Sequence, residues 1–191
     1  MIKDKKITKV LMSFIALITI VALIALMNNL DKDSKYYAKQ FLEILATPEE
    51  AEFTKYYRTI FDSDNKTETE IQQNYINYVD LTKKEYGELM TKEAFDNAIS
   101  NRLIPWDLLI KEDSNYTVEV DLIDVKKMSY YKDGRVHYAY SISLIVLFSN
   151  GENEAATVSG DIVMIKENGR WIVDVFRWNS DYDNLYKMLL I

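Results

Sequence analysis

The stretch that decides the fold is VSGDIVMIKENGRWIVDVFRW, Val158–Trp178. Two runs rich in β-branched and aromatic residues flank its central dipeptide, Asn168-Gly169. Asn-Gly pairs adopt the positive φ angles of a tight hairpin turn, and β-branched and aromatic residues are enriched in strands. The stretch therefore predicts two antiparallel strands joined by a tight turn.

Two similar turns lie upstream of this hairpin. Asp133-Gly134 and Asn150-Gly151 each separate runs of strand-like composition. The sequence thus predicts four strands: Tyr116–Leu122, Val136–Phe148, Ala155–Lys166 and Trp171–Trp178. Strands that follow one another through short turns pair with their neighbours, so we expect a curved, four-stranded antiparallel meander.

Residues before about position 104 follow a helical spacing instead. The two clearest apolar stripes are Tyr37, Phe41, Ile44 and Leu45, and Ile71, Tyr75, Tyr78 and Val79. Capping residues predict helix starts at four places: Thr47 with Glu50, Thr67 with Glu70, Thr82 with Glu85, and Thr91. Pro105 ends this half of the chain. Helices that precede a meander predict an α+β fold.

The N-terminal segment predicts a transmembrane helix. Val10–Met27 contains no charged residue, no Gly and no Pro. With the residues that follow it reaches the roughly 20 residues needed to cross a bilayer, and it exceeds the signal-peptide core of about 7–15 residues. No small-residue cleavage site follows it. We expect an uncleaved signal anchor over residues 10–29, with a cleaved Sec signal as the alternative.

The charges around the anchor predict its orientation. Four Lys and one Asp lie within residues 1–9, and positive charge favours the cytoplasmic side of a membrane. Residues 1–9 are therefore expected to form a cytoplasmic tail. Residues 30–191 are expected to form one extracytoplasmic domain, which is large enough to bury its own hydrophobic core.

The composition excludes several classes of function. The chain has a formal charge of −7, and its first 30 residues carry +3, so the remainder carries −10. Nucleic-acid binding needs Lys and Arg to neutralise phosphates, so an acidic domain argues against it. The chain has no Cys and one His, which excludes disulfides and the usual zinc sites. We expect no metal and no cofactor, in an exported protein of bacterial type.

The terminal hairpin Glu167–Asp174 carries a family resemblance. With the helices and meander before it, it is similar to the nuclear transport factor 2-like (cystatin-like) superfamily, whose members often end on a polar residue, Gly, Lys or Arg, Trp and an apolar residue. The resemblance covers roughly residues 34–180 and implies a cone, in which helices pack on a curved sheet. One membrane span followed by one exported cone resembles the membrane-anchored scaffold subunits of type IV secretion and conjugation channels.

Enzymes of this superfamily place an Asp, or an Asp/His pair, in an apolar pocket of the cone. Three Asp residues lie on predicted strands: Asp121, Asp161 and Asp174. Their sequence neighbours are apolar and point to the opposite face, so each Asp is expected on the solvent side. Asp174 is separated from Ile172, Phe176 and Trp178 by even numbers of residues, so the alternation places all four on one face of the strand. The candidate pocket is therefore Asp174, Phe176 and Trp178.

His137 is the only histidine. It shares a strand face with Ala139 and Ser141, and the sequence supplies no partner for it. A histidine without an orienting group is a poor candidate for a general base. We expect a structural or surface role for His137 and assign no catalytic residue.

The C-terminal end is markedly apolar. It carries Leu185, Met188, Leu189, Leu190 and Ile191. One interpretation is a lid that folds over the cone or against its sheet. The other is a docking peptide for another subunit, since apolar surface left in water attracts partners. On the second interpretation these five residues are the predicted partner contacts.

Together these features predict a non-enzymatic, membrane-anchored scaffold that binds other proteins, as part of a conjugation or secretion channel. The expected partners are the membrane, crossed once, and other membrane or envelope proteins, with a homo-oligomer as a further option. One alternative is a small-molecule-binding or catalytic cone facing the cell wall. Another is a membrane-tethered regulatory or immunity-type protein.

The first testable prediction concerns the anchor. Because no cleavage site follows the apolar segment, the mature protein should retain residues 1–29 and stay with membranes after carbonate washing. N-terminal sequencing and fractionation check this. A mature N-terminus near residues 28–34 would show that the segment is a removed signal.

Overall fold

The computed structural model describes residues 32–47, 67–104, 116–179 and 185. The predicted anchor, the helix expected after Thr47 and the residues from Met188 onward lie outside this part of the chain. Within it, no helix is both long enough and apolar enough to span a membrane.

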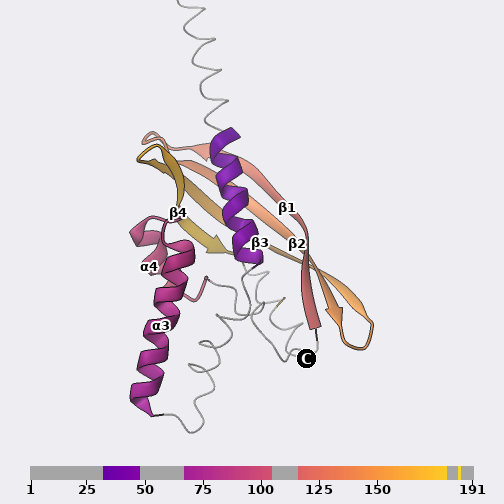
Figure 1. The fold of residues 1–191 in the computed structure, drawn as a ribbon. Coiled ribbons are helices and arrows are strands. Elements are labelled where there is room, and N and C mark those ends of the chain that lie inside the picture. The colour runs from indigo at the N-terminus through magenta and orange to yellow at the C-terminus, as the bar shows by residue number, and fades with distance from the viewer. Residues whose placement is uncertain (1–31, 48–66, 105–115, 180–184, 186–191) are drawn as a thin grey trace, which may run out of the picture. The chain divides into compact units, whose positions relative to one another are not determined.

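The described part is an α+β fold in which three helices precede a sheet (Figure 1). The first helix covers residues 32–46. Two more helices follow, α3 Glu68–Tyr86 and α4 Lys92–Ser100. The strands are β1 Tyr116–Tyr130, β2 Val136–Phe148, β3 Asn153–Glu167 and β4 Arg170–Trp178. The predicted α+β class is confirmed.

The four strands form the predicted antiparallel meander, in the order β1-β2-β3-β4. The glycines of the three predicted turns, Gly134, Gly151 and Gly169, all have φ between 84° and 89°. This is the left-handed region that glycine adopts without steric cost. The turns therefore form where the dipeptides indicated.

β1 extends further than predicted. The prediction stopped near Leu122 because two irregularities interrupt the alternation of the strand. The pairing with β2 shifts between Val120 and Leu122 and again between Lys127 and Ser129. Each shift leaves one residue, Asp121 or Met128, without an opposite residue on β2. A bulge of this kind reverses the inward and outward pattern. The pairing continues to Tyr130 although the simple alternation stops near Leu122.

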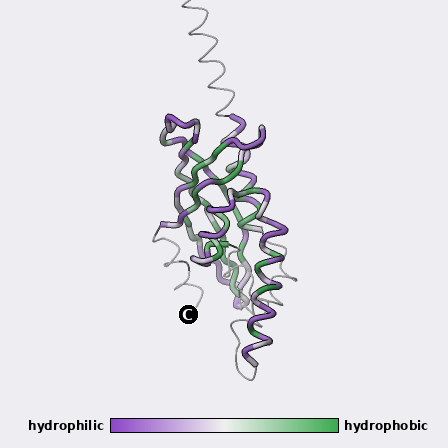
Figure 2. Tube along the Cα trace, turned by 90° about the vertical axis from the view of Figure 1, so that its left-hand side faces the viewer, coloured by the Kyte–Doolittle hydropathy of each residue, from purple (hydrophilic) through white to green (hydrophobic). Residues whose placement is uncertain are grey.

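One face of the sheet forms the core. Alternate residues of β2 are at most 3% exposed: Val136, Tyr138, Tyr140, Ile142, Leu144 and Val146. Hydrophobic and hydrophilic residues alternate along the strands in Figure 2. Phe41 of the first helix packs edge-on against Phe176 of β4 and Tyr86 of α3, with ring centroids 5.3 Å and 6.3 Å apart. These contacts place helices over the buried face.

Two predicted helix starts are confirmed. Thr67 forms a full capping box with Glu70: its hydroxyl accepts from the Glu70 N–H at 3.3 Å, and the Glu70 carboxylate accepts from the Thr67 N–H at 2.9 Å. The Thr91 hydroxyl accepts from the Ala94 N–H at 3.1 Å and caps α4. In both cases the side chain satisfies an N–H group that the first helical turn leaves unpaired.

The helix start predicted at Thr82 with Glu85 is wrong. α3 continues through this position, and the buried Thr82 hydroxyl donates to the Tyr78 carbonyl one turn earlier at 2.8 Å. The buried stripe of α3 is Tyr78, Thr82 and Tyr86, whereas Tyr75 is 47% exposed. Thr can bond to its own helix in this way, so a Thr-x-x-Glu pattern does not always mark a helix start.

Gly160 should tolerate no side chain. A Cβ there would collide with the Arg177 carbonyl oxygen and the Tyr140 hydroxyl. We expect Gly160→Ala to lower the free energy of unfolding by about 1–3 kcal/mol, the usual cost of overpacking. Denaturant unfolding measures this. Thr157→Ala, an exposed change on the same strand, is the control and should stay within about 0.5 kcal/mol; equal stability of both variants would contradict the close approach.

Candidate functional site

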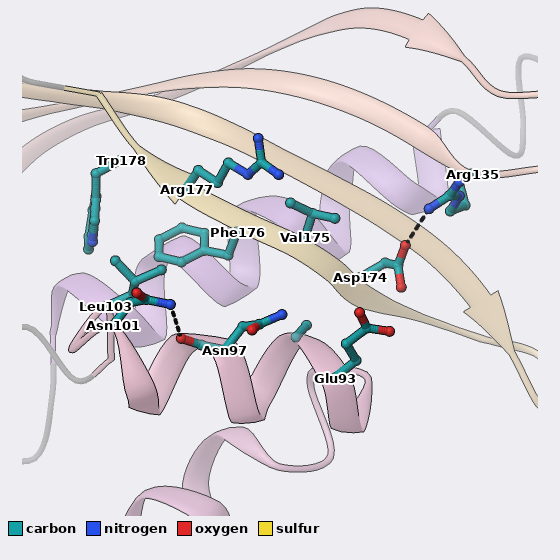
Figure 3. Close-up of a pocket in the computed structure, with 11 residues that line it drawn as sticks. Glu93, Asn97, Asn101, Leu103, Arg135, Asp174, Val175, Phe176, Arg177 and Trp178 are labelled. Carbon is teal, nitrogen blue, oxygen red and sulfur yellow. Dashed lines mark hydrogen bonds and ion pairs between the residues drawn. The ribbon is translucent and has the colours of Figure 1, made fainter.

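A pocket of about 630 Å³ lies between α4 and the second half of β4 (Figure 3). The helix and the turn after it contribute Glu93, Ala94, Asn97, Asn101 and Leu103. The strand contributes Asp174, Val175, Phe176, Arg177 and Trp178, and Arg135 lies just before β2. The three residues of the predicted pocket, Asp174, Phe176 and Trp178, thus lie along one wall of the same cavity.

α4 presents a polar face to this cavity. Glu93, Asn97 and Asn101 are spaced by four residues, and residues at this spacing share one face of a helix. The Asn101 side-chain amide donates to the Asn97 carbonyl at 2.8 Å, which holds Asn101 at the end of the helix. Ala94 and Ala98 of the same helix are buried. The helix therefore offers carboxylate and amide groups above an apolar base.

Asp174 is placed by a bulge that the alternation of the sequence did not reveal. The pairing of β3 with β4 shifts between Val163 and Met164, which leaves Asp174 as the extra residue. Ile172 lies opposite Ile165, whereas Phe176 lies opposite Ile162. Positions 162 and 165 of one strand point to opposite faces. The expected sharing of a face by Asp174 and Phe176 with Ile172 is therefore wrong, although Asp174, Phe176 and Trp178 still meet in the pocket.

Arg135 links Asp174 to the hairpin that precedes β2. Its Nη1 donates to Asp174 Oδ2 at 2.9 Å, and its Nε donates to Asp133 Oδ2 at 2.9 Å. The Asp174 side chain is 21% exposed and that of Arg135 34%. The hydrogen bond from Arg135 lowers the pKa of Asp133, and the two carboxylates raise the pKa of Arg135. The carboxylate predicted for the pocket is thus one end of a three-residue charge network.

Aromatic rings line the other end of the pocket. Phe176 packs edge-on against Trp178 at 4.9 Å and stacks on Tyr140 at 5.7 Å, measured between ring centroids. The Tyr140 hydroxyl donates to the Arg177 carbonyl at 3.0 Å. Burial, with a smaller effect of the Asp161 charge, raises the pKa of Tyr140, so this hydroxyl stays protonated and can donate. The pocket therefore combines a charged end with an aromatic end.

His137 has a partner that sequence reasoning missed. Its Nε2 lies 2.6 Å from Asp161 Oδ1, and its ring stacks on Tyr131 with centroids 6.4 Å apart. Asp161 lies opposite Ala139, two residues along β2 from His137. Residues two apart on a strand share a face, so His137 and Asp161 are diagonal neighbours across the two strands. Knowledge of the register of β2 and β3 would have predicted this pair.

The His137–Asp161 pair points away from the core, on the face that Arg177 of the pocket lining shares, since Arg177 lies opposite Asp161. His137 alternates with the buried residues Val136 and Tyr138, so it points away from the core. His137 bonds to Asp161 and Asp174 bonds to Arg135, and no hydrogen bond or ion pair joins His137 to Asp174 among the described residues. Asp121 is an exposed bulge residue of β1 and is separate from both.

The described residues contain no group of three or more His, Asp or Glu side chains that could hold a metal ion. The two carboxylates of the pocket lining, Glu93 and Asp174, come from α4 and β4. The chemistry that the described lining supplies is hydrogen bonding through amides, ion pairing and aromatic contact.

Of the predicted partner contacts at the C-terminus, the structure describes only Leu185. This side chain is 2% exposed. Met188, Leu189, Leu190 and Ile191 lie outside the described residues, and their role as partner contacts stays a prediction.

Comparison with known proteins gives no family for the chain. No family model matches the sequence, and no curated protein matches it. Among solved structures, the chain is similar to Aln2 from a Streptomyces species. The two are 15% identical, the match covers 74% of this chain and 97% of that chain, and the TM-score is 0.29.

The charge network predicts a specific dependence of stability on pH. Because the pKa of Asp133 is lowered in the folded state, its carboxylate stabilises the fold above its ordinary pKa of 3.8. This contribution is lost as the pH falls through the lowered pKa. Wild type should therefore exceed Asp133→Asn in stability at pH 7, and the difference should shrink below about pH 4.

Denaturant unfolding at a series of pH values measures this difference. In an Arg135→Met background, the Asp133→Asn substitution should have a smaller pH-dependent effect, because the guanidinium donor is gone whereas the backbone N–H of residue 135 still donates to Asp133 Oδ1. A difference that grows on acidification would contradict the assignment.

Proposed function

We propose that the chain is a non-enzymatic, membrane-anchored, extracytoplasmic domain that binds other proteins and serves as a scaffold or assembly component. The observation that carries the proposal is the composition of the pocket beside β4. The carboxylate of Asp174, at its charged end, is held by Arg135 at 2.9 Å. Its remaining described lining supplies the Glu93 carboxylate, amides, a second arginine and aromatic rings, which are groups suited to recognition.

The edge of β4 supports binding of an extended segment. Val173 already pairs with the loop before α4: its N–H donates to the Leu89 carbonyl, and its carbonyl accepts from the Thr91 N–H, both at 2.8 Å. This pairing is a single bridge, and the pocket begins at the next residue, Asp174. An extended peptide that follows an exposed strand edge gains main-chain hydrogen bonds and takes its specificity from adjacent side-chain pockets. Asn97 and Asn101 supply donors and acceptors beside that path.

The finer assignment is to the cone-shaped nuclear transport factor 2-like superfamily, with a place in a conjugation or secretion channel. Helices followed by a four-stranded antiparallel meander support the first part. The apolar segment over residues 10–29 supports the second. A tethered domain meets membrane partners at a raised effective concentration, which suits a component whose role is to hold others in place.

A small-molecule-binding or catalytic cone is the second candidate. It is favoured by the pocket volume of about 630 Å³, which lies within the roughly 300–1,000 Å³ of small-molecule sites. The aromatic end formed by Phe176 and Trp178 also suits a small apolar ligand. A membrane-tethered regulatory or immunity-type protein is a further option that would use the same surface.

Substitutions in the full-length, membrane-inserted chain separate these functions. If the domain binds proteins, partner capture should survive Asp174→Asn and His137→Ala. Capture should fall about tenfold or more in Asn97→Trp, which fills the pocket, because a few contacts carry most of an interface's energy. Lys92→Trp, on the 92% exposed side chain of the same helix, is the matched control and should leave capture unchanged. Removal of the anchor, or Leu189, Leu190 and Ile191 changed to Ser, should also abolish function.

Quantitative co-purification from membranes measures capture, and thermal melts establish that each variant is folded. A catalytic site would respond differently, since removal of a general base lowers the rate by about 10²–10⁴. Loss of function in Asp174→Asn alone, with the anchor, the C-terminal residues and Asn97 dispensable, would overturn the scaffold proposal in favour of pocket chemistry.

A further inference from the structure

The sheet has a second edge on the side opposite the pocket. β1 is the outermost strand, and in the described part of the chain only β2 pairs with it. It is one of the two longest strands, with 15 residues. The outer N–H and C=O groups of an edge strand are a template for pairing with another strand. This edge is independent of the pocket between α4 and β4.

Large apolar side chains are exposed along β1 and the turn after it. Leu122 is 57% exposed, Met128 55%, Tyr131 43% and Tyr130 37%. They account for four of the seven large hydrophobic side chains that the described residues expose. Apolar side chains gathered in this way mark interaction sites on protein surfaces.

The charges of β1 are divided at Val125. Glu119, Asp121 and Asp124 precede this residue in the acidic part of the strand, and Lys126 and Lys127 follow it in the basic part. All five side chains are exposed. An antiparallel copy of the same strand would place its basic part against this acidic part, and its acidic part against this basic part. A parallel copy would oppose like charges, which destabilises paired strands. The charges of β1 are therefore complementary to those of a second copy of β1 only when the two copies run antiparallel.

We propose that β1 is a homodimer interface, in which two copies of the chain pair their β1 edges antiparallel about a two-fold axis near Val125. With Val125 on the axis, Asp124 of each copy lies opposite Lys126 of the other. The same register brings Leu122 opposite Met128. A symmetric interface of this type is self-complementary, so both pairs occur twice.

The bulges of β1 limit how far the pairing extends. Between Leu122 and Lys127 the strand pairs with β2 without a shift, whereas Asp121 and Met128 interrupt it on either side. A bulge bends the strand and increases its twist, which ends regular edge pairing. With Val125 on the axis, the section that is regular in both copies is therefore residues 123–127, and the contact of Leu122 with Met128 lies at its ends.

The opposite edge of the sheet explains why the pairing closes at two copies. There, β4 is partly covered by the bridge from residues 89–91 to Val173. When the two copies pair through their β1 edges, both of these edges are occupied. No β1 edge is left for a third copy, so the assembly cannot grow into a fibre. So short a paired section forms a small interface. Anchoring both copies in one membrane would raise their effective concentration and favour this contact. This last step rests on the anchor of the proposed function.

Cysteine cross-linking in membranes tests the proposal, because the chain contains no Cys of its own. In the proposed register, the two copies of Lys126 are diagonal neighbours across the axis, about 7–8 Å apart. Lys126→Cys in the full-length chain should therefore give a dimer with a short bismaleimide reagent. Thr117→Cys is the matched control, exposed on the same strand. Antiparallel pairing separates its two copies by about 16 residues of strand, on the order of 50 Å. Lys92→Cys, on α4, controls for random collision.

The expected result is a dimer from Lys126→Cys and none from either control. Equal cross-linking of all three would overturn the proposal, as would a dimer from Thr117→Cys, which indicates parallel pairing. Cross-linking of Lys126→Cys only to a different protein would also overturn it.

Charge reversal gives a second test, in which every chain carries Lys126→Cys. The basic variant adds Glu119→Lys, Asp121→Lys and Asp124→Lys, and the acidic variant adds Lys127→Glu. Two copies of either variant should cross-link about tenfold less than two copies of Lys126→Cys alone, because like charges face each other. Co-expression of the basic and acidic variants, distinguished by tags of different size, should restore the dimer as a mixed pair.

Recovery in the mixed pair would also show that both variants are folded. A mixed pair that cross-links no better than either variant alone would contradict the interface. Because this readout is the pairing of two copies, its failure leaves the capture of other proteins at the α4–β4 pocket as a separate question.

Discussion

The contact of Tyr140 with Gly160 and Arg177 ties three strands together at the end of the sheet where the pocket lies. Tyr140 extends from β2 across the bare backbone of Gly160 on β3, and its hydroxyl donates to the Arg177 carbonyl of β4 at 3.0 Å. A side chain on Gly160 would occupy the space that the Tyr140 ring uses. Burial keeps the hydroxyl protonated, so the donor is retained across the physiological pH range. The ring also stacks on Phe176, which fixes the wall of the pocket.

Arg135 provides the corresponding restraint at the charged end of the pocket. It bridges the tip of the first hairpin to the bulge in β4 through Asp133 and Asp174. A half-exposed ion pair contributes little free energy, but a guanidinium with two carboxylate partners is confined in orientation. The pocket therefore lies between two fixed points, an aromatic contact and a charge network. This arrangement suits a surface that must keep its shape for a partner.

The two edges of the sheet differ in a way that suits separate uses. β4 is accompanied by α4 and by the bridge at Val173, so its edge forms one wall of a hollow. β1 carries exposed apolar and charged side chains along the other edge. Because β2 and β3 lie between them, contacts at one edge leave the other accessible. A domain with two independent edges can hold a copy of itself and a different partner at once, as the proposed scaffold requires.

The sequence by itself determined the fold class, the four strands, the three turns and two of the helix caps. Each of these depends on neighbouring residues: a glycine that adopts positive φ, a threonine three residues before a glutamate, an alternation of apolar side chains. It also singled out Asp174, Phe176 and Trp178 from their alternation along one strand, and all three line the pocket although Ile172 does not share the face of Phe176. Where a local pattern had two physical outcomes, sequence reasoning failed. Thr82 bonded back to Tyr78 within α3 and did not start a new helix.

Only the tertiary structure decided what depends on register between strands. The bulge at Asp174 separates Ile172 from Phe176, and it arises from the pairing of β4 with β3, which the sequence of β4 does not contain. In the same way, Asp161 became the partner of His137 and Arg135 the partner of Asp174, across 24 and 39 residues of chain. The packing of whole strands selects such partners, because many long-range pairings are compatible with the same local propensities. The pocket beside α4 and the outer edge of β1 are likewise consequences of strand order.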